Sequence, residues 1–474
     1  MSIPSSLKQI SVVRSIGSRL LGSRLLGSWL LGLSLSVAAS ASTGTDVNLN
    51  TKDVRAGGTP VGDLIRVPIE RVAITENVFY VSGLANVYLV NTPEGAVVID
   101  TGFAHQAPKQ MALLKEVLKG PVKYIFLPQG QQDDVGGISL IRDEDTQIIM
   151  TRSSAEYMVH RKRASQFLLP RYAELYSWTK ELMKKSQQQA KKKDPFPYKP
   201  ITPDVMVEDH EGYKFELGGV KFEVLALPGA EGINSAGLWM PEEKILFAGG
   251  GSVGPEIPMW PNLGTVRSDR NRILEEYIDT LNTMIKLEPE ILLPGQDEPI
   301  TDKKEIMSNL TLLRDAATYV YDEIWAGLSQ GKDVYELMRD IQLPEEYSSL
   351  SQQHGRVEWT VRETVNQAGA WFQYKYTSEL YPYRPTVVYQ DLVELAGGVD
   401  NVISMAQKKL KEGDPIKAIH LVEVALEAEP DNKKVNETHV QVLQVLLKRA
   451  AETHKTFSEI AWLQSQIGKA KAKL

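Results

Sequence analysis

The sequence predicts a mixed α/β domain followed by an all-helical domain, and three observations support this. Short β-branched and aromatic runs, broken by turn residues, alternate with helical segments as far as residue 302. From Lys303 onward only helical periodicity remains. The chain has 474 residues, more than one core usually organises, and its 42% hydrophobic content supports packed cores rather than disorder.

The first domain, residues 66–302, begins with strands. Runs at 67–74, 78–81, 86–91 and 96–100 are typical of an antiparallel meander with one buried face. A helix at 111–118 and a buried strand at 122–127 should follow. Further strands are expected at 146–150, 213–217, 221–226 and 244–248, and a helix at 271–287. This alternation predicts sheets covered by helices.

A polar insertion interrupts this domain at residues 153–200. Its run 187–193 is nearly all charge and amide, which predicts a helical excursion with a solvated tip; a functional lid is the alternative. In the helical domain, residues 303–474, small residues and a proline fall at the spacing of one tetratricopeptide-like hairpin: Ala406, Ala418, Ala425 and Pro430. One such unit cannot bury its own face, so it should pack on other helices or on another subunit.

The N-terminus has the features of a signal peptide. Basic residues precede an apolar run at 29–39 that is short for a spanning helix, and Ala39-Ser40-Ala41 supplies small residues for cleavage. We expect residues 1–41 to be removed, 42–65 to form a flexible tail, and the protein to be periplasmic or secreted. A membrane anchor and an amphipathic surface helix are the alternatives.

The composition excludes several chemistries. The formal charge of -7 argues against a phosphate-tracking surface, so no nucleic acid partner is expected. The absence of cysteine excludes disulfides, thiolate zinc sites and a cysteine nucleophile.

The most informative segment about chemistry is Phe-Leu-Pro-Gln-Gly-Gln-Gln-Asp-Asp-Val-Gly-Gly at 126–137, which follows a predicted buried strand. It resembles the His-x-His-x-Asp-His motif of the metallo-β-lactamase superfamily, whose members hold a pair of zinc ions. In this register Gln129 and Gln131 stand at the first two histidines. Asp133 matches the aspartate, and Asp134 replaces the third histidine.

Three later segments resemble the same family in order. They place Ala230, Gly250 and Gln296 at the next histidine, the bridging aspartate and the final histidine. None of the 7 histidines lies at a motif position. Amide and methyl groups cannot replace imidazole or carboxylate on zinc, so we expect no metal and no other cofactor. A harder ion, calcium or magnesium, on the remaining oxygen atoms is one alternative, and zinc is the expected cofactor if the chain is instead an active hydrolase of this family.

The downstream segments resemble alkyl sulfatases. Asn-Leu-Gly-Thr-Val-Arg-Ser-Asp at 262–269 is similar to one of their active-site stretches, and residues 355–372 and 393–398 are similar to their dimerisation domain. The resemblance implies a metallo-β-lactamase αββα sandwich, then a tetratricopeptide-like dimerisation domain and a homodimer. It also implies an anion contact at Arg267 beside Asn262; a salt bridge from Arg267 to Asp269 or Glu275 is the alternative.

Two functions follow from these observations. The first is an exported, non-catalytic binding or scaffold protein, a pseudoenzyme, that holds an amphiphilic or anionic small molecule at Asn262 and Arg267. The second is a hydrolase of sulfate esters with a rebuilt or non-zinc site, in which Asp133 and Asp134 perform acid–base chemistry. Because function belongs to the site rather than to the fold, we expect the first.

Overall fold

The computed structural model describes residues 68–175, 199–267, 269–369 and 371–474. The predicted signal peptide, the N-terminal tail and the tip of the insertion lie outside these residues. None of the helices in the described ranges is long and apolar enough to cross a membrane.

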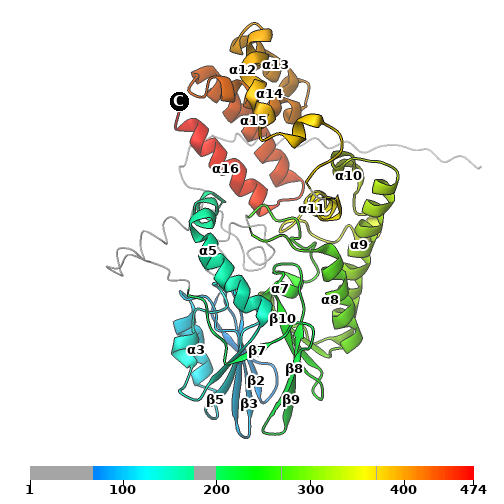
Figure 1. The fold of residues 1–474 in the computed structure, drawn as a ribbon. Coiled ribbons are helices and arrows are strands. Elements are labelled where there is room, and N and C mark those ends of the chain that lie inside the picture. Colours follow the sequence, from blue (N-terminus) through cyan, green and yellow to red (C-terminus); the bar gives the residue numbers. More distant parts are fainter. Residues whose placement is uncertain (1–67, 176–198, 268, 370) are drawn as a thin grey trace, which may run out of the picture. The chain divides into compact units, whose positions relative to one another are not determined.

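Two β-sheets form the N-terminal domain (Figure 1). The first sheet follows sequence order: β1 (Arg71–Ala73), β2 (Val78–Val81), β3 (Val87–Thr92), β4 (Gly95–Ile99), β5 (Val122–Phe126), β6 (Gln147–Thr151) and β7 (Val205–Val207). Its strands pair antiparallel up to β4 and parallel from β4 onward. The second sheet has the order β12 (Ile291–Pro294), β11 (Ile245–Ala248), β10 (Ala236–Met240), β9 (Val220–Ala226) and β8 (Tyr213–Leu217). Only its β11–β12 pair is parallel.

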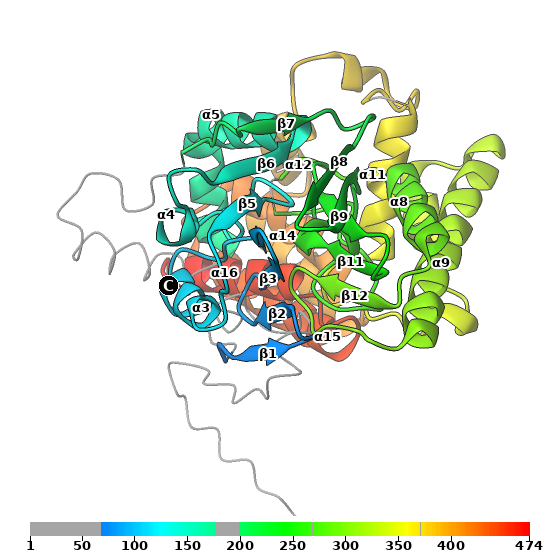
Figure 2. The ribbon, with the colours of Figure 1, turned by 90° about the horizontal axis from the view of Figure 1, so that it is seen from below.

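Helices cover the outer faces of both sheets, as Figure 2 shows. The first sheet packs against α3 (Ala107–Lys115), and the second against α8 (Leu274–Leu287) and α9 (Lys303–Ser329). Between the sheets lies an apolar core in which the rings of Tyr88 and Phe247 are 5.4 Å apart. The predicted αββα sandwich is therefore confirmed.

The meander differs from its prediction in one respect. We expected one buried face, but every residue of β4 is buried. Val97 faces the second sheet, while Val98 packs with Met111 and Leu114 of α3, so each face of the strand has a covering layer. A strand covered on both sides reads as a continuous apolar run, which is what Gly95–Ile99 shows.

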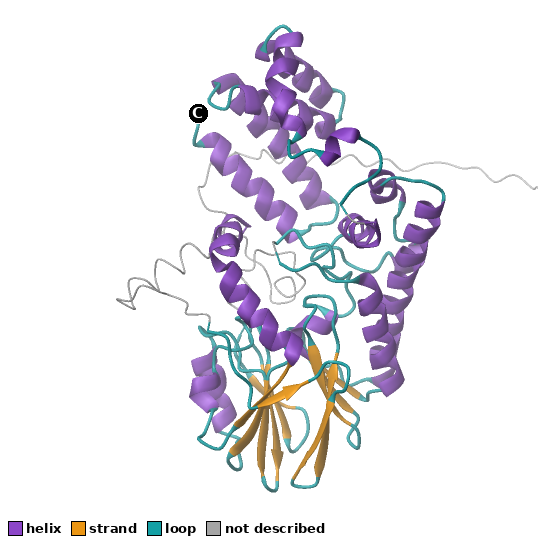
Figure 3. Ribbon diagram, in the orientation of Figure 1, coloured by secondary structure: helices purple, strands orange, loops and turns teal. Residues whose placement is uncertain are grey.

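The C-terminal part is helical, as predicted (Figure 3). After α9 come α10 (Val334–Asp340), α11 (Val357–Gly369), α12 (Tyr389–Leu395), α13 (Val399–Lys411), α14 (Pro415–Ala428), α15 (Lys433–Glu452) and α16 (Phe457–Lys471). The predicted hairpin is α13 and α14, where Ala406, Ala418 and Ala425 are fully buried in one cluster. The face that the hairpin cannot bury alone is covered by α15 through Val435 and Val442.

The segment between α11 and α12 exposes many large apolar side chains. Trp371 is 68% exposed, Tyr374 86% and Tyr383 71%. An uncovered apolar surface of this kind is typical of an interaction site.

Candidate functional site

The motif positions meet in the loops that follow β5, β9, β11 and β12. Gln296 Nε2 donates to Asp133 Oδ2 at 3.3 Å, which joins the loop after β12 to the loop after β5. A β-carbon on Gly250, in α7 (Gly249–Val253), would lie 3.2 Å from Gln129 Nε2 and 3.5 Å from Gln296 Cγ. Gln131 Nε2 donates to the backbone oxygen of Glu231 at 3.1 Å, next to Ala230. The positions that correspond to the family motifs therefore lie together in the structure.

These residues do not fit a zinc pair. Gln129 is buried, and its Oε1 accepts from Ser235 Oγ at 3.3 Å and from Gln131 Nε2 at 3.4 Å, so the amides bind one another. The space in front of Gly250 is taken by the side chains of Gln129 and Gln296. In the described parts of the chain, no group of three or more His, Cys, Asp or Glu could hold a metal ion. Zinc requires such donors, and a neutral amide does not replace them.

Asp134 is fully buried and contacts Asp100, a residue that our sequence analysis missed. Asp100 ends β4 with a positive φ of 68°, and its Oδ1 accepts from the backbone nitrogens of Thr101 at 2.6 Å and Gly102 at 2.8 Å. Asp100 Oδ2 and both oxygens of Asp134 meet no donor among the described residues. Burial raises the pKa of Asp100 to about 7, and burial followed by repulsion from Asp100 raises the pKa of Asp134. Two such carboxyl groups satisfy each other when they share a proton.

Asp133 differs from this pair because it is only half-buried. Burial raises its pKa, while the charge of Arg161 and the hydrogen bond from Gln296 oppose the increase. Of the two predicted acid–base residues, Asp133 is the one that solvent and a ligand can reach. The buried Asp134 does not fit that role.

Arg267 pairs with Glu231, and not with Asp269 or Glu275, the partners that the sequence analysis gave as the alternative. Arg267 Nη2 is 2.5 Å from Glu231 Oε2 and 3.1 Å from His354 Nε2. Glu231 Oε1 binds His354 Nε2, and the imidazole stacks on Phe457 with ring centroids 5.4 Å apart. With its amide in the swapped orientation, the predicted Asn262 accepts from Arg267 Nε at 3.0 Å.

The ionisation of this cluster follows from its contacts. Burial of Glu231 opposes its charge, but the charge of Arg267, the hydrogen bond from His354 and the charge of Arg272 together outweigh burial and hold the pKa of Glu231 well below its ordinary value. Burial lowers the pKa of His354, which keeps the imidazole neutral. Glu231 therefore remains a carboxylate.

Helix α5 (Arg152–Leu175), in the predicted insertion, adds a second polar cluster next to the first. Tyr157 Oη donates to Asp269 at 2.9 Å, and Arg161 Nη1 donates to Tyr157 Oη at 3.3 Å and to Tyr172 Oη at 2.7 Å. Arg272 is 3.5 Å from Asp269 and also donates to the backbone oxygen of Glu231 at 2.5 Å. The insertion thus supplies side chains to the site in addition to any solvated tip.

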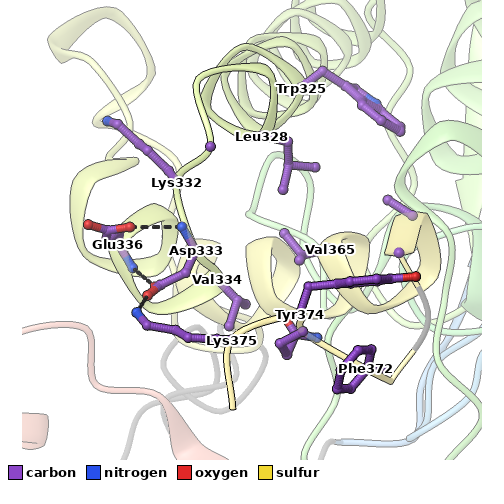
Figure 4. Close-up of a pocket in the computed structure, with 14 residues that line it drawn as sticks. Trp325, Leu328, Lys332, Asp333, Val334, Glu336, Val365, Phe372, Tyr374 and Lys375 are labelled. Atoms are coloured by element: carbon purple, nitrogen blue, oxygen red, sulfur yellow. Dashed lines mark hydrogen bonds and ion pairs between the residues drawn. The ribbon is translucent and has the colours of Figure 1, made fainter. Parts of the chain in front are cut away.

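A pocket of about 430 Å³ lies elsewhere, among α9, α10 and α11. Trp325, Leu328 and Val365 line its apolar side, and Lys375 pairs with Asp333 at its rim (Figure 4). The same Asp333 caps α10 in a reciprocal pair with Glu336. None of the motif residues lines this pocket.

Comparison with known proteins assigns both domains. The model of the metallo-beta-lactamase superfamily matches residues 155–296, and the model of alkyl sulfatase dimerisation matches residues 333–458. A linear primary-alkylsulfatase from Pseudomonas sp. (strain ATCC 19151) is 22% identical over 360 residues, which are 73% of this chain and 67% of the relative. An alkyl/aryl-sulfatase from Saccharomyces cerevisiae is 22% identical over 399 residues, 79% of this chain and 60% of the relative.

Solved structures agree on the fold. The stereoselective inverting sec-alkylsulfatase Pisa1 from Pseudomonas sp. superposes with a TM-score of 0.69 at 17% identity, covering 84% of this chain and 66% of that one. A double mutant of the sec-alkyl sulfatase PisA1 gives a TM-score of 0.72 at 16% identity, covering 86% of this chain and 66% of that one. This chain therefore spans about two thirds of the length of its relatives.

Two sequence-based predictions are contradicted by these comparisons. The curated relatives are named as sulfatases, which argues against a non-catalytic binding or scaffold protein. The matched superfamily is one of metalloenzymes, which argues against the expectation of no cofactor, even though the residues present do not fit a zinc pair. The order of the two domain models and the shared fold show that the chain belongs to the alkyl sulfatase-like branch of the metallo-β-lactamase superfamily.

Proposed function

We propose that this protein is a hydrolase of alkyl sulfate esters. The proposal rests on one observation above others: at the position of the family's active site, the charge of Arg161 acts on the half-buried carboxylate of Asp133, and Arg161 and Arg272 both contact Asp269. Hydrolysis of a sulfate ester needs cationic donors for the sulfate group and a base for the attacking water. The sulfatase names of the relatives supply the substrate class.

Asp133 is the residue to which we assign the base. Its raised pKa lies closer to neutral pH than that of an ordinary aspartate, which favours proton transfer from water. Gln296 donates to Asp133 Oδ2 and so fixes the orientation of the carboxylate. Asp133 would take a proton from water as the water oxygen forms a bond to sulfur; the bond between sulfur and the alkyl oxygen breaks, and the departing alkoxide takes a proton from solvent to leave as the alcohol.

Arg267 is the residue to which we assign the sulfate contact, with Asn262 beside it. A guanidinium binds two oxygens of a tetrahedral anion at once. Arg267 is 14% exposed, so a bound sulfate would be partly desolvated and its contact strengthened. The described residues lack a set of zinc ligands, so the proposed roles fall on the side chains of the chain itself.

The test is release of inorganic sulfate from a short primary alkyl sulfate by the purified full chain, assayed after chelation and with added zinc, magnesium or calcium. Asp133→Asn should lower kcat by about 100-fold or more, the usual contribution of a general base. Asp145→Asn, a change at an exposed aspartate, is the matched control. Absence of sulfate release under all these conditions, or an unchanged kcat in Asp133→Asn, would refute the proposal.

We also infer a homodimer that covers the exposed segment between α11 and α12. The match to an alkyl sulfatase dimerisation model over residues 333–458 includes this segment. Light scattering at micromolar concentration should give twice the mass of the chain, and a monomer would contradict this inference.

Export remains a proposal drawn from the N-terminal sequence alone. The basic residues, the apolar run and Ala39-Ser40-Ala41 support cleavage after residue 41. N-terminal sequencing of protein recovered outside the cytoplasm should begin at Ser42, and an intact Met1 there would contradict it.

A further inference from the structure

The carboxylate of Glu231 contacts the same side chains that a sulfate ester would need for its own binding. Its Oε2 is 2.5 Å from Arg267 Nη2, and its Oε1 binds His354 Nε2. The residue is only 6% exposed, so these contacts form away from bulk water. A carboxylate and a sulfate group both offer two oxygens to a guanidinium, so they compete for one position.

The positive and negative charges of the cluster nearly cancel, so a second anion is only weakly attracted. Arg161, Arg267 and Arg272 carry three positive charges against the carboxylates of Glu231 and Asp269. Asp133 adds a third negative charge nearby, since Glu231 and Arg161 both act on its pKa. A sulfate ester that enters while Glu231 stays in place therefore meets a cluster that is already neutralised.

Hydrogen bonds fix the backbone of Glu231, whereas its carboxylate lies among the charged side chains of the cluster. Its nitrogen donates to Gly251 O at 2.8 Å, and its oxygen accepts from Gln131 Nε2 at 3.1 Å and Arg272 Nη2 at 2.5 Å. Displacement of the carboxylate therefore requires rotation of one side chain and no movement of the loop.

We propose that Glu231 is an internal anion that occupies the sulfate position, so that an anionic substrate binds only by displacing its carboxylate. This inference rests on the proposed function for the identity of the substrate, but the occupancy of Arg267 does not depend on turnover. Glu231 thereby determines how tightly the site holds a sulfate group. An uncharged amide at this position removes the charge of Glu231 from Arg267 and opens the position to an external anion.

Inorganic sulfate is the probe, titrated by calorimetry into the full chain at constant ionic strength. Glu231→Gln should bind sulfate at least tenfold more tightly than the native chain, whereas Glu231→Asp, which keeps the charge, should gain less. The double variant Glu231→Gln with Arg267→Ala should lose the gain. Asp269→Asn is the matched control, because it removes a carboxylate that contacts Arg272 and Tyr157 and not the Arg267 position.

The outcomes separate a resident anion from a structural ion pair. If Glu231→Gln unfolds alone, sulfate should restore its folding and chloride at the same ionic strength should not; failure of that rescue overturns the inference. Equal sulfate affinity in Glu231→Gln and the native chain, or an equal gain in Asp269→Asn, also overturns it. A native chain that hydrolyses no sulfate ester, together with a gain in Glu231→Gln, leaves this inference standing and removes the proposed function.

Discussion

The buried pair of Asp100 and Asp134 predicts a loss of stability as the pH rises from about 4 through about 7, and one amide substitution should remove most of that loss. Burial raises the pKa of Asp100 from 3.8 to about 7. This difference corresponds to roughly 4 kcal/mol at about 1.4 kcal/mol per pKa unit. A raised pKa means that the folded chain binds more protons than the unfolded chain, so the stabilisation is complete below about pH 4 and is lost as the pH rises through about 7.

Asp134→Asn should abolish most of that loss. The new amide can donate to Asp100 Oδ2, which lacks a donor among the described residues, so Asp100 then tolerates its charge. Native chain and variant should have similar free energies of unfolding near about pH 4, while the variant should be more stable by a few kcal/mol near about pH 8.5. Urea denaturation at both values measures the difference, and comparing the two proteins cancels the titration of all other groups.

The reasoning is refuted if the free energy of unfolding falls between these two pH values by the same amount in both proteins. It is also refuted if the variant is the less stable protein at the higher pH. Either result means that the two carboxyl groups do not share a proton in the native fold.

Three further predictions test the site and the assembly. Arg267→Ala should destabilise the chain by roughly 3 to 5 kcal/mol in urea denaturation, because it leaves the buried carboxylate of Glu231 short of a cation; an unchanged free energy of unfolding would show that the pair with Glu231 is not formed. The triple variant Gln129→His, Gln131→His and Ala230→His should bind about one more zinc per chain than the native protein, by elemental analysis, because three imidazoles then converge; no gain would mean that the register is wrong. Leu380→Glu should shift the dimer toward monomer in light scattering, because it places a charge in the exposed apolar segment, whereas an unchanged mass would locate the interface elsewhere.

The fold could be predicted where local pattern and motif order agree. The strands at 78–81 and 213–217 and the buried alanines of α13 and α14 are where the sequence places them. The strands β7, β10 and β12 were missed for physical reasons. β7 has only three residues, and β10 is buried throughout, so it shows no alternation; its pairing with β9 and β11 decides its conformation.

The site could be predicted in position but not in its contacts. The motif register brings Asp133 and Gln296 within a hydrogen bond although they are 163 residues apart. By contrast, our sequence analysis did not single out Glu231, although it lies next to Ala230, which stands at a histidine position of the family motif. Its partner His354 lies 123 residues away. No local periodicity encodes such a pair, because the contact arises only when the loop after β9 meets the segment before α11.

The site lacks the imidazole ligands of the family motif, so its carboxylates must be stabilised by other groups. A buried carboxylate requires either a cation or a proton. Glu231 has cations, since Arg267 and Arg272 hold its pKa low, whereas Asp100 and Asp134 have none and are stable only with a shared proton. Asp133 lies between these limits, with an amide donor from Gln296 and contact with solvent. Because Asp133 alone of these groups is accessible and not already neutralised by direct contact with an arginine, chemistry at this site depends on it, and access for an anion depends on the side chain of Glu231.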